Sequence, residues 1–403
     1  MNRALRSATF ALALLLAATT ARATWSIIVV DTESKEVCIA SATCLMGFNL
    51  EIYLPVLRVD VGAGAAQSFV DTTGQNRLRI WNGLIAGTPP ADILLELEAN
   101  DPGHQTRQYG MVDVLGRTLT FTGSGAGAYA NGVTGQVGRL AYAIQGNVIT
   151  GPPVIIEIER VIREYPGDIP TKMMYAMEIG FKTGGDGRCS CSQNAPTFCG
   201  SPPNRTWRKA SHTAFLIDAR RGDADGVCNT EAGCTSGAYF INLNYITSTF
   251  AQRDPVLQMA DGFAAMRFDA LGKFDQAASL VTITPPEIPA DGTATATLRV
   301  ELRDWMLGPA QDVVSLIIEH DPRGSTGSSA IGTPQMVGDG VWEAPLTAGT
   351  TTGLDVLAVR VNNGASERYV IPSGKLTLTP PRLVAPAGNR ATVRRPSLAP
   401  ASR

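Results

Sequence analysis

The chain has 403 residues, of which 17% are charged, and a formal net charge of −2. A net charge this small and negative gives no broad positive potential at the surface, which argues against nucleic acid as a partner. The length exceeds what one compact core usually holds, so we expect two domains with flanking segments. Its 41 glycines and 25 prolines suit a strand-rich and loop-rich exported protein.

Residues 1–23 have the pattern of a secretory signal peptide. Arg3 and Arg6 give a positive start, residues 10–18 form an apolar run, and Ala21-Arg22-Ala23 is typical of a cleavage site. The run is shorter than the roughly 20 apolar residues of a membrane span, and no later segment is long and apolar enough. We expect a secreted or periplasmic protein, or one at the cell surface, that begins at Thr24 and has no membrane span.

The pattern of residues 24–272 predicts alternating groups of strands and helices. Strands are expected at residues 25–30, 37–42, 54–61, 63–69, 109–114, 117–121, 140–145, 214–218 and 239–245. Helices are expected at residues 78–84, 91–99, 154–165, 171–181 and 254–268. Each helical pair has to cover one apolar sheet face. Two sheets packed face to face between helical layers fit this order, which predicts an α+β fold of four αββα layers.

From about residue 277 the composition changes to period-two alternation without helical segments. Strands are expected at residues 293–302, 313–318, 341–346, 356–361 and 375–378. This order predicts a small β-sandwich over residues 277–379. Residues 380–403 are rich in proline, alanine and arginine, and we expect them to be disordered.

Seven cysteines in an exported chain indicate disulfide bonds. Cys228 with Cys234 is the best candidate pair, because it would close a short loop. Cys191 with Cys199 is the next. The odd count leaves at least one thiol unpaired or paired between chains, and the pattern does not select one connectivity.

Three further uses of cysteine stay open. Cys38 and Cys44 lie on or just after a predicted strand, so either could be a buried thiol. A zinc site from Cys189, Cys191 and Cys199 is an alternative to disulfides there, although export to an oxidising compartment favours bridges.

No cofactor is expected, and the other candidate metal ligands are weak. Asp223 and Asp225 alternate in a loop that cysteines would close, as Ca²⁺ ligands do, but the full twelve-residue pattern is missing. The three histidines, His104, His212 and His320, are scattered, so no histidine-based triad emerges and each is read as structural or at the surface.

Several stretches of the first region form an ordered set: Thr24–Ile28 and residues 57–67, 101–103, 108–113, 121–123, 145–147, 184–188 and 211–217. In this order they resemble the uncharacterised Ntn-hydrolase-like family called domain of unknown function 1028. Residues 189–210, with three cysteines, are an insertion relative to that family. The resemblance covers about residues 24–267 and implies the four-layer αββα fold with an N-terminal nucleophile.

Two stretches of the second region, residues 290–296 and 338–342, are distinctive. Through them this region resembles bacterial Ig-like domains of the invasin and intimin type. This resemblance implies an Ig-like β-sandwich and a cell-surface or extracellular partner that binds through it.

Cleavage before Thr24 would place a hydroxyl and an α-amine on one residue. In an N-terminal-nucleophile enzyme the hydroxyl attacks an amide carbonyl and the amine accepts its proton. Arg58 is the candidate cation that would lower the pKa of that amine, with an ion pair to Asp60 or Asp31 as the alternative. Asn147 and Gly146 are the candidate donors to the oxyanion, unless they form a simple turn.

Four more residues are candidates for support. Thr43 and Gln67 could hydrogen-bond the amine or the substrate, or belong to the core. Asp186 and Arg188 could form a structural ion pair or hold a substrate carboxylate.

The sequence therefore predicts a secreted hydrolase of a small amide or peptide-like substrate, with Thr24 as nucleophile. The alternative is a non-catalytic surface, binding or adhesion protein that keeps the same scaffold.

Overall fold

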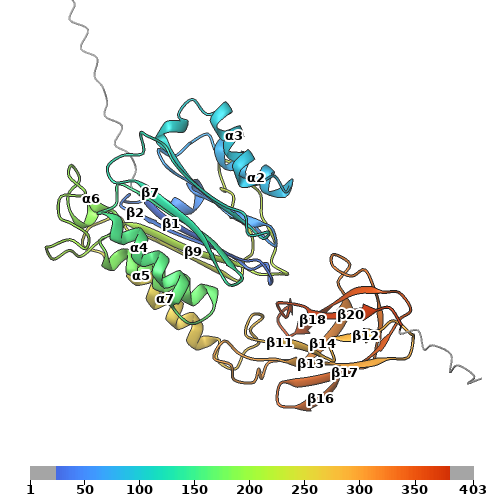
Figure 1. The fold of residues 1–403 in the computed structure, drawn as a ribbon. Helices are drawn as coiled ribbons and strands as arrows, with labels where there is room; N and C mark the ends of the chain where they lie inside the picture. Colours follow the sequence, from blue (N-terminus) through green and yellow to red (C-terminus); the bar gives the residue numbers. More distant parts are fainter. Residues whose placement is uncertain (1–23, 382–403) are drawn as a thin grey trace, which may run out of the picture.

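The computed structural model describes residues 24–381 (Figure 1). The expected signal peptide and nearly all of the expected C-terminal tail lie outside this range. An α/β unit comes first and an all-β unit follows it. The last helix of the first unit ends at Asp269 and the first strand of the second begins at Leu280, on either side of the predicted boundary.

The first unit contains two antiparallel sheets. The six-stranded sheet has the order β10-β9-β2-β1-β8-β7, and the four-stranded sheet has the order β3-β4-β5-β6. The strands are β1 (Thr24–Asp31), β2 (Val37–Thr43), β3 (Pro55–Arg58), β4 (Gly62–Ser68), β5 (Arg107–Asp113), β6 (Thr118–Thr122), β7 (Asn131–Val137), β8 (Leu140–Asn147), β9 (Thr213–Ala219) and β10 (Ile241–Ile246).

Helices cover the outer face of each sheet (Figure 1). They are α1 (Leu50–Tyr53), α2 (Gln75–Ile85), α3 (Pro90–Asn100), α4 (Pro152–Glu164), α5 (Ile169–Lys182), α6 (Gly187–Ser190) and α7 (Pro255–Asp269), with a 3-10 turn at His104–Thr106. The described part of the chain holds no helix long and apolar enough to span a membrane.

Alternation along β1 shows how the layers form. Trp25, Ile27 and Val29 share a core with α4, α5 and α7. Ile28 and Val30 point the other way and pack against the four-stranded sheet, since successive side chains of a strand face opposite sides. That sheet in turn packs its other face on α2 and α3. The layers therefore run helices, sheet, sheet, helices.

A close contact fixes the turn after α5. Gly185 has a φ of +47°, and a Cβ there would lie 2.7 Å from the ring of Trp25, which is fully buried. Glycine is required here by both the left-handed backbone and the lack of space. The residue that follows, Asp186, belongs to the candidate site.

The second unit is a β-sandwich of two sheets. Their orders are β11-β13-β17-β15, with β16 also on β17, and β12-β20-β18-β14, with β19 also on β18. The strands are β11 (Leu280–Thr284), β12 (Glu287–Pro289), β13 (Thr295–Glu301), β14 (Ser315–His320), β15 (Ser329–Ile331), β16 (Gln335–Gly338), β17 (Val341–Ala348), β18 (Gly353–Asn362), β19 (Glu367–Tyr369) and β20 (Gly374–Thr379). Both sheets contribute to one apolar core.

A buried group of charges joins the two units around Arg220, which is fully buried. It contacts Glu36 at 2.7 Å, Asp275 at 3.0 Å and Asp218 at 3.3 Å. Burial and the Glu36 carboxylate raise the pKa of Asp218 well above its ordinary value. Burial opposes ionisation of Asp275 too, but Arg220 and backbone amides outweigh it and hold the pKa of Asp275 low.

Every strand and helix predicted for the first unit is present, with shifted ends. The sequence patterns missed β7, α1 and α6 there, and β11, β12, β15, β16 and β19 in the sandwich. β7 is Asn131-Gly-Val-Thr-Gly-Gln-Val at the edge of its sheet, and its two glycines and polar residues hide the alternation.

Candidate functional site

Three candidate residues meet at one end of the six-stranded sheet. Thr24 opens β1, and it lies directly opposite Thr43 on β2 and Asn147 on β8. Side chains of directly opposed residues lie on the same face of an antiparallel sheet. That face is the one of Ile28 and Val30, so all three side chains point between the two sheets.

The Thr24 hydroxyl is part of a short polar chain. Thr24 Oγ1 lies 3.4 Å from Thr43 Oγ1, and Arg188 Nη2 lies 3.5 Å from that same Thr43 oxygen. Both distances are at the upper limit of a hydrogen bond. The Thr24 side chain is only 1% exposed in this chain, in which its nitrogen is still a peptide nitrogen. Arg188 is therefore the described cation that reaches this end of the sheet.

Asp186 holds Arg188 in place. Its carboxylate accepts from Arg188 Nε at 3.1 Å and Arg188 Nη2 at 2.7 Å, in a pair that is almost completely buried. It also accepts the backbone amide of Cys44 at 2.6 Å. A disulfide between Cys44 and Cys189 joins the same two segments covalently. The predicted ion pair is confirmed, and the structure ties it to the end of β2, next to Thr43.

Asn147 and Gly146 lie where an oxyanion donor would be needed, but they have partners in this form. Asn147 Nδ2 donates to Ala126 O at 3.0 Å and to Ser68 Oγ at 3.2 Å. The carbonyl of Gly146 accepts from Gln108 Nε2 at 3.0 Å. An oxyanion role for the Asn147 side chain would require it to exchange one of these bonds.

A network of buried amide side chains lies beneath Thr24. Gln67 Nε2 donates to the Thr24 carbonyl at 3.1 Å and to Gln108 Oε1 at 2.7 Å, while Ser26 Oγ donates to Gln67 Oε1 at 2.6 Å. Gln145 Nε2 donates to Ser26. Sequence analysis named Gln67 but missed Ser26, Gln108 and Gln145 as partners. The signal that could have identified these three residues was their polar side chains within otherwise apolar strands.

The prediction for Arg58 is wrong. Arg58 ends β3 and is paired with Gly62 at the start of β4, whereas Gln67 and Ser68, near Thr24, end that strand. Arg58 instead forms a 3.0 Å ion pair with Asp225 and stacks on Trp81. The direction of the hairpin, which the sequence pattern does not fix, carries Arg58 away from the site.

The cysteine predictions are confirmed in part. Both expected pairs, Cys228–Cys234 and Cys191–Cys199, are disulfides. Cys38 is a buried thiol. Cys44 is not, because it is bonded to Cys189, and this pairing also removes the proposed zinc set of Cys189 with Cys191 and Cys199.

The weak calcium candidates do not converge. Asp225 binds Arg58, as described, whereas Asp223 accepts from Arg368 and from the backbone amides of Arg220 and Phe240. Among the histidines, the ring of His104 lies against the ring of Phe121 at a tilt of 33°. His320 contacts Asp355 at 2.8 Å.

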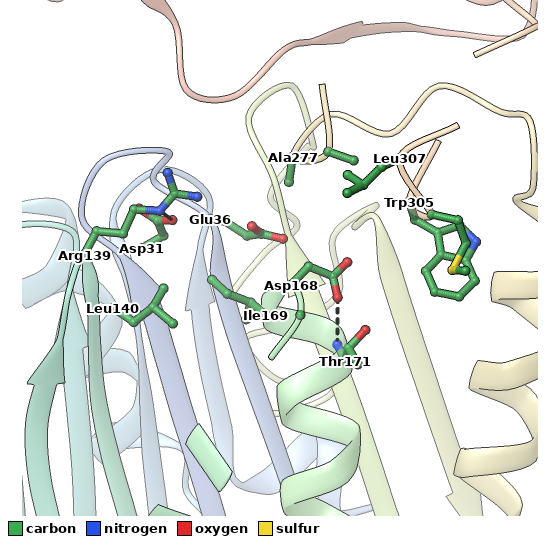
Figure 2. Close-up of a pocket in the computed structure, with 13 residues that line it drawn as sticks. Asp31, Glu36, Arg139, Leu140, Asp168, Ile169, Thr171, Ala277, Trp305 and Leu307 are labelled. Atoms are coloured by element: carbon green, nitrogen blue, oxygen red, sulfur yellow. Dashed lines mark hydrogen bonds and ion pairs between the residues drawn. The ribbon is translucent and has the colours of Figure 1, made fainter. Parts of the chain in front are cut away.

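A cleft of about 560 Å³ lies at the other end of β1, between the two units (Figure 2). Asp31, Glu36 and Asp168 line one side, and Trp305 and Leu307 line the other. Its carboxylates have partners: Asp31 with Arg139 at 2.6 Å, Glu36 with Arg220, and Asp168 with the amide of Thr171. At about 3.3 Å per residue, the eight-residue β1 places this cleft roughly 23 Å from Thr24. It does not serve the Thr24 site.

Comparison with known proteins gives a family match over less than half of the chain. Residues 24–198 match a family model. Its description is "Family of unknown function (DUF1028)", and the match begins at Thr24 itself. No curated protein matches the chain.

Solved structures show distant likenesses. A Silicibacter pomeroyi protein described with DUF1028 is 16% identical with a TM-score of 0.44, over 60% of this chain and 88% of that one. The Yersinia pseudotuberculosis adhesin InvE is 25% identical with a TM-score of 0.22, over 27% of this chain and 28% of that one. The Escherichia coli adhesin FdeC is 9% identical with a TM-score of 0.22, over 88% and 96%. At these TM-scores none of the three decides the fold or function of this chain.

Proposed function

We propose that this protein is an exported N-terminal-nucleophile hydrolase of a small amide or peptide-like substrate, on an αββα fold of the Ntn-hydrolase type. Cleavage after Ala23 would free the α-amine of Thr24. The Thr24 hydroxyl would then attack the substrate carbonyl, and the amine would accept the hydroxyl proton and pass it to the leaving nitrogen.

The observation that carries this proposal is the place of Thr24. It opens a central strand, between Thr43 and Asn147, with its side chain directed between the sheets. The buried cation Arg188 reaches it through the Thr43 hydroxyl. The family match starts at the same residue.

Arg188 takes the role that sequence analysis gave to Arg58. A free α-amine has an ordinary pKa of about 7.7–8.0, and a nearby fixed cation lowers it, which increases the neutral fraction near pH 7. Asp186 offsets part of that charge and fixes its position. Gln67 would hold the Thr24 carbonyl, and Asn147 or the Gly146–Asn147 backbone would donate to the oxyanion.

The test is turnover on a panel of chromogenic amino-acid and N-acyl amides by the chain that begins at Thr24. Thr24→Ala should abolish turnover while the protein stays folded, and Thr24→Ser should retain part of it. A form that keeps Ala23 should be inactive, because the nitrogen of Thr24 is then in a peptide bond and cannot accept the hydroxyl proton. Turnover that survives in Thr24→Ala would refute the mechanism.

A pH profile separates the two arginines. Arg188→Gln should raise the pKa of the amine and move the acid limb of kcat/KM to higher pH, because a nearby positive charge is lost. Arg58→Gln is the matched control and should leave the limb in place, since Arg58 lies at the far end of the hairpin. Equal shifts in both variants would contradict the assignment.

A non-catalytic binding protein is the second candidate, and the 1% exposure of Thr24 favours it. The Ig-like sandwich would then bind a cell-surface or extracellular partner. Its edge strand β16 is exposed throughout, with Met336 and Val337 each more than half exposed. Under this hypothesis Thr24→Ala changes nothing, whereas Met336→Glu with Val337→Glu abolishes binding to cells.

A further inference from the structure

Three side chains that bind soft metals meet beside the Asp186–Arg188 pair. The sulfur atoms of Cys44 and Cys189 and a ring nitrogen of His212 all lie within 4.8 Å of one another. Cys44 follows β2, Cys189 lies in α6, and His212 directly precedes β9. The two cysteines are half-buried, whereas His212 is completely buried.

The hydrogen bonds of Thr247 favour one tautomer of His212. Thr247 Oγ1 donates to the His212 carbonyl at 3.0 Å, so its only proton is already used. The 2.8 Å contact between that oxygen and His212 Nδ1 therefore has Nδ1–H as donor. His212 Nε2 is left with a bare lone pair, and it has no hydrogen-bond partner within the described chain.

A metal ligand has to be a neutral imidazole with a bare ring nitrogen, which is what this arrangement leaves at Nε2. A buried, unpartnered nitrogen is costly in a folded protein and calls for an explanation.

We propose that the dithiol form of the Cys44–Cys189 pair, together with His212 Nε2, is a binding site for a Zn²⁺-class cation. This proposal does not depend on the hydrolase proposal being correct. An external dithiol breaks the S–S bond and supplies two electrons and two protons, and is itself oxidised to a disulfide. The cation then displaces the two thiol protons, and the fourth position stays open to water or an added ligand.

The geometry fits this use. Zn–S bonds of about 2.3 Å and Zn–N bonds of 2.0–2.1 Å at tetrahedral angles place the ligand atoms roughly 3.5–3.8 Å apart. The two sulfur atoms and a ring nitrogen of His212 are already within 4.8 Å of one another. Reduction of the S–S bond lets the two sulfur atoms move apart. Thr247 supplies the outer hydrogen bond that orients a ligating histidine. The half-buried sulfurs give reductant and metal a route in.

The experiment uses Co²⁺ as the probe on the full chain, reduced with a dithiol that is then removed under anaerobic conditions. The reduced protein should bind one Co²⁺ with sulfur-to-cobalt charge-transfer bands and the strong visible bands of tetrahedral cobalt, and Zn²⁺ should displace it. The oxidised protein should show neither band. His212→Asn keeps a donor toward Thr247 but loses Nε2.

The variants should form a graded series. His212→Asn should weaken Zn²⁺ binding by more than the roughly 10–100-fold that loss of an outer partner costs, and Thr247→Val should fall within that range. Cys228→Ser with Cys234→Ser should bind as the parent does. If Cys191→Ser with Cys199→Ser abolishes binding while His212→Asn does not, the cation is held by the other cysteines and the proposal is overturned.

A second chain tests the site without reduction. Cys44→Asp cannot form this disulfide, and it offers a carboxylate in place of one thiolate while the other two disulfides stay intact. It should bind Co²⁺ with a weaker charge-transfer band, and adding His212→Asn should remove that binding. Absence of bound cobalt in both the reduced parent and the Cys44→Asp chain would refute the site.

Discussion

Replacing Cys44 and Cys189 by alanine should destabilise the first unit more than removal of either other disulfide. The bond joins residues separated by 145 positions, against 8 for Cys191–Cys199 and 6 for the third pair. The chain-entropy relation gives about 5 kcal/mol for the long loop and about 2–2.5 kcal/mol for each short one. The effect is expected mainly in the unfolded state, which the long cross-link restricts most.

Calorimetry of the oxidised chain and the three double-alanine variants measures this difference. Removal of the long link should lower the melting temperature of the first unit by about 10–20 °C, because 1 kcal/mol corresponds to about 2–4 °C at this size. The sandwich contains no cysteine, so its transition is an internal control and should move little. Guanidinium unfolding should give the same order of stability.

One result would refute this reasoning. If all three variants lose the same stability, loop length does not govern the effect, and the long bond does not hold the Asp186 segment against β2. Suppose instead that only the Cys44 and Cys189 variant loses stability, and that Arg188→Gln no longer shifts the acid limb of kcat/KM in that variant. This result would support the view that the Cys44–Cys189 bond positions Arg188.

Two matched pairs of variants test the packing and the buried charges. Gly185→Ala should cost about 2–5 kcal/mol, because it combines a left-handed backbone with a clash against a buried tryptophan ring, whereas Gly47→Ala, with φ of +64° and open space, should cost only about 1–2 kcal/mol in the same denaturation assay. Asp275→Asn should destabilise the protein at pH 7, and the difference from wild type should fade as the pH drops through the lowered pKa of Asp275, since a depressed carboxyl pKa stabilises only above it. Asp218→Asn should cost little or stabilise at pH 7, because a raised pKa means that the ionised Asp218 is less stable in the fold than in the unfolded chain. Equal losses from both aspartate variants, measured by urea unfolding from pH 3 to 8, would contradict the assigned pKa directions.

The layers could be predicted because the strands and helices that build them carry strong periodic patterns. Trp25, Ile27 and Val29 alternate with Ile28 and Val30, so a strand buried on both faces was readable. β7 and β16 were not, because a strand at a sheet edge needs little apolar surface and shows little alternation.

The contacts between residues far apart in the chain could not be predicted from the sequence. Seven cysteines that form three bonds allow 105 pairings, and nothing local connects Cys44 to Cys189 over 145 positions. The sequence analysis named Arg58 as the cation and gave Arg188 only an ion pair or a substrate carboxylate, because the direction of the β3–β4 hairpin and the Cys44–Cys189 bond cannot be derived from local patterns. Thr24 and Asn147 were found because the motifs around them could be recognised, whereas their opposition across β1 and β8 depends on register.

The most direct test of the central claim is the N-terminal sequence and intact mass of the exported protein. The account predicts a chain that begins at Thr24 with an unmodified α-amine, and with Cys38 as its sole free thiol. A chain that begins at any other residue, or whose Thr24 amine is blocked, would contradict the hydrolase mechanism and leave the binding protein as the better description.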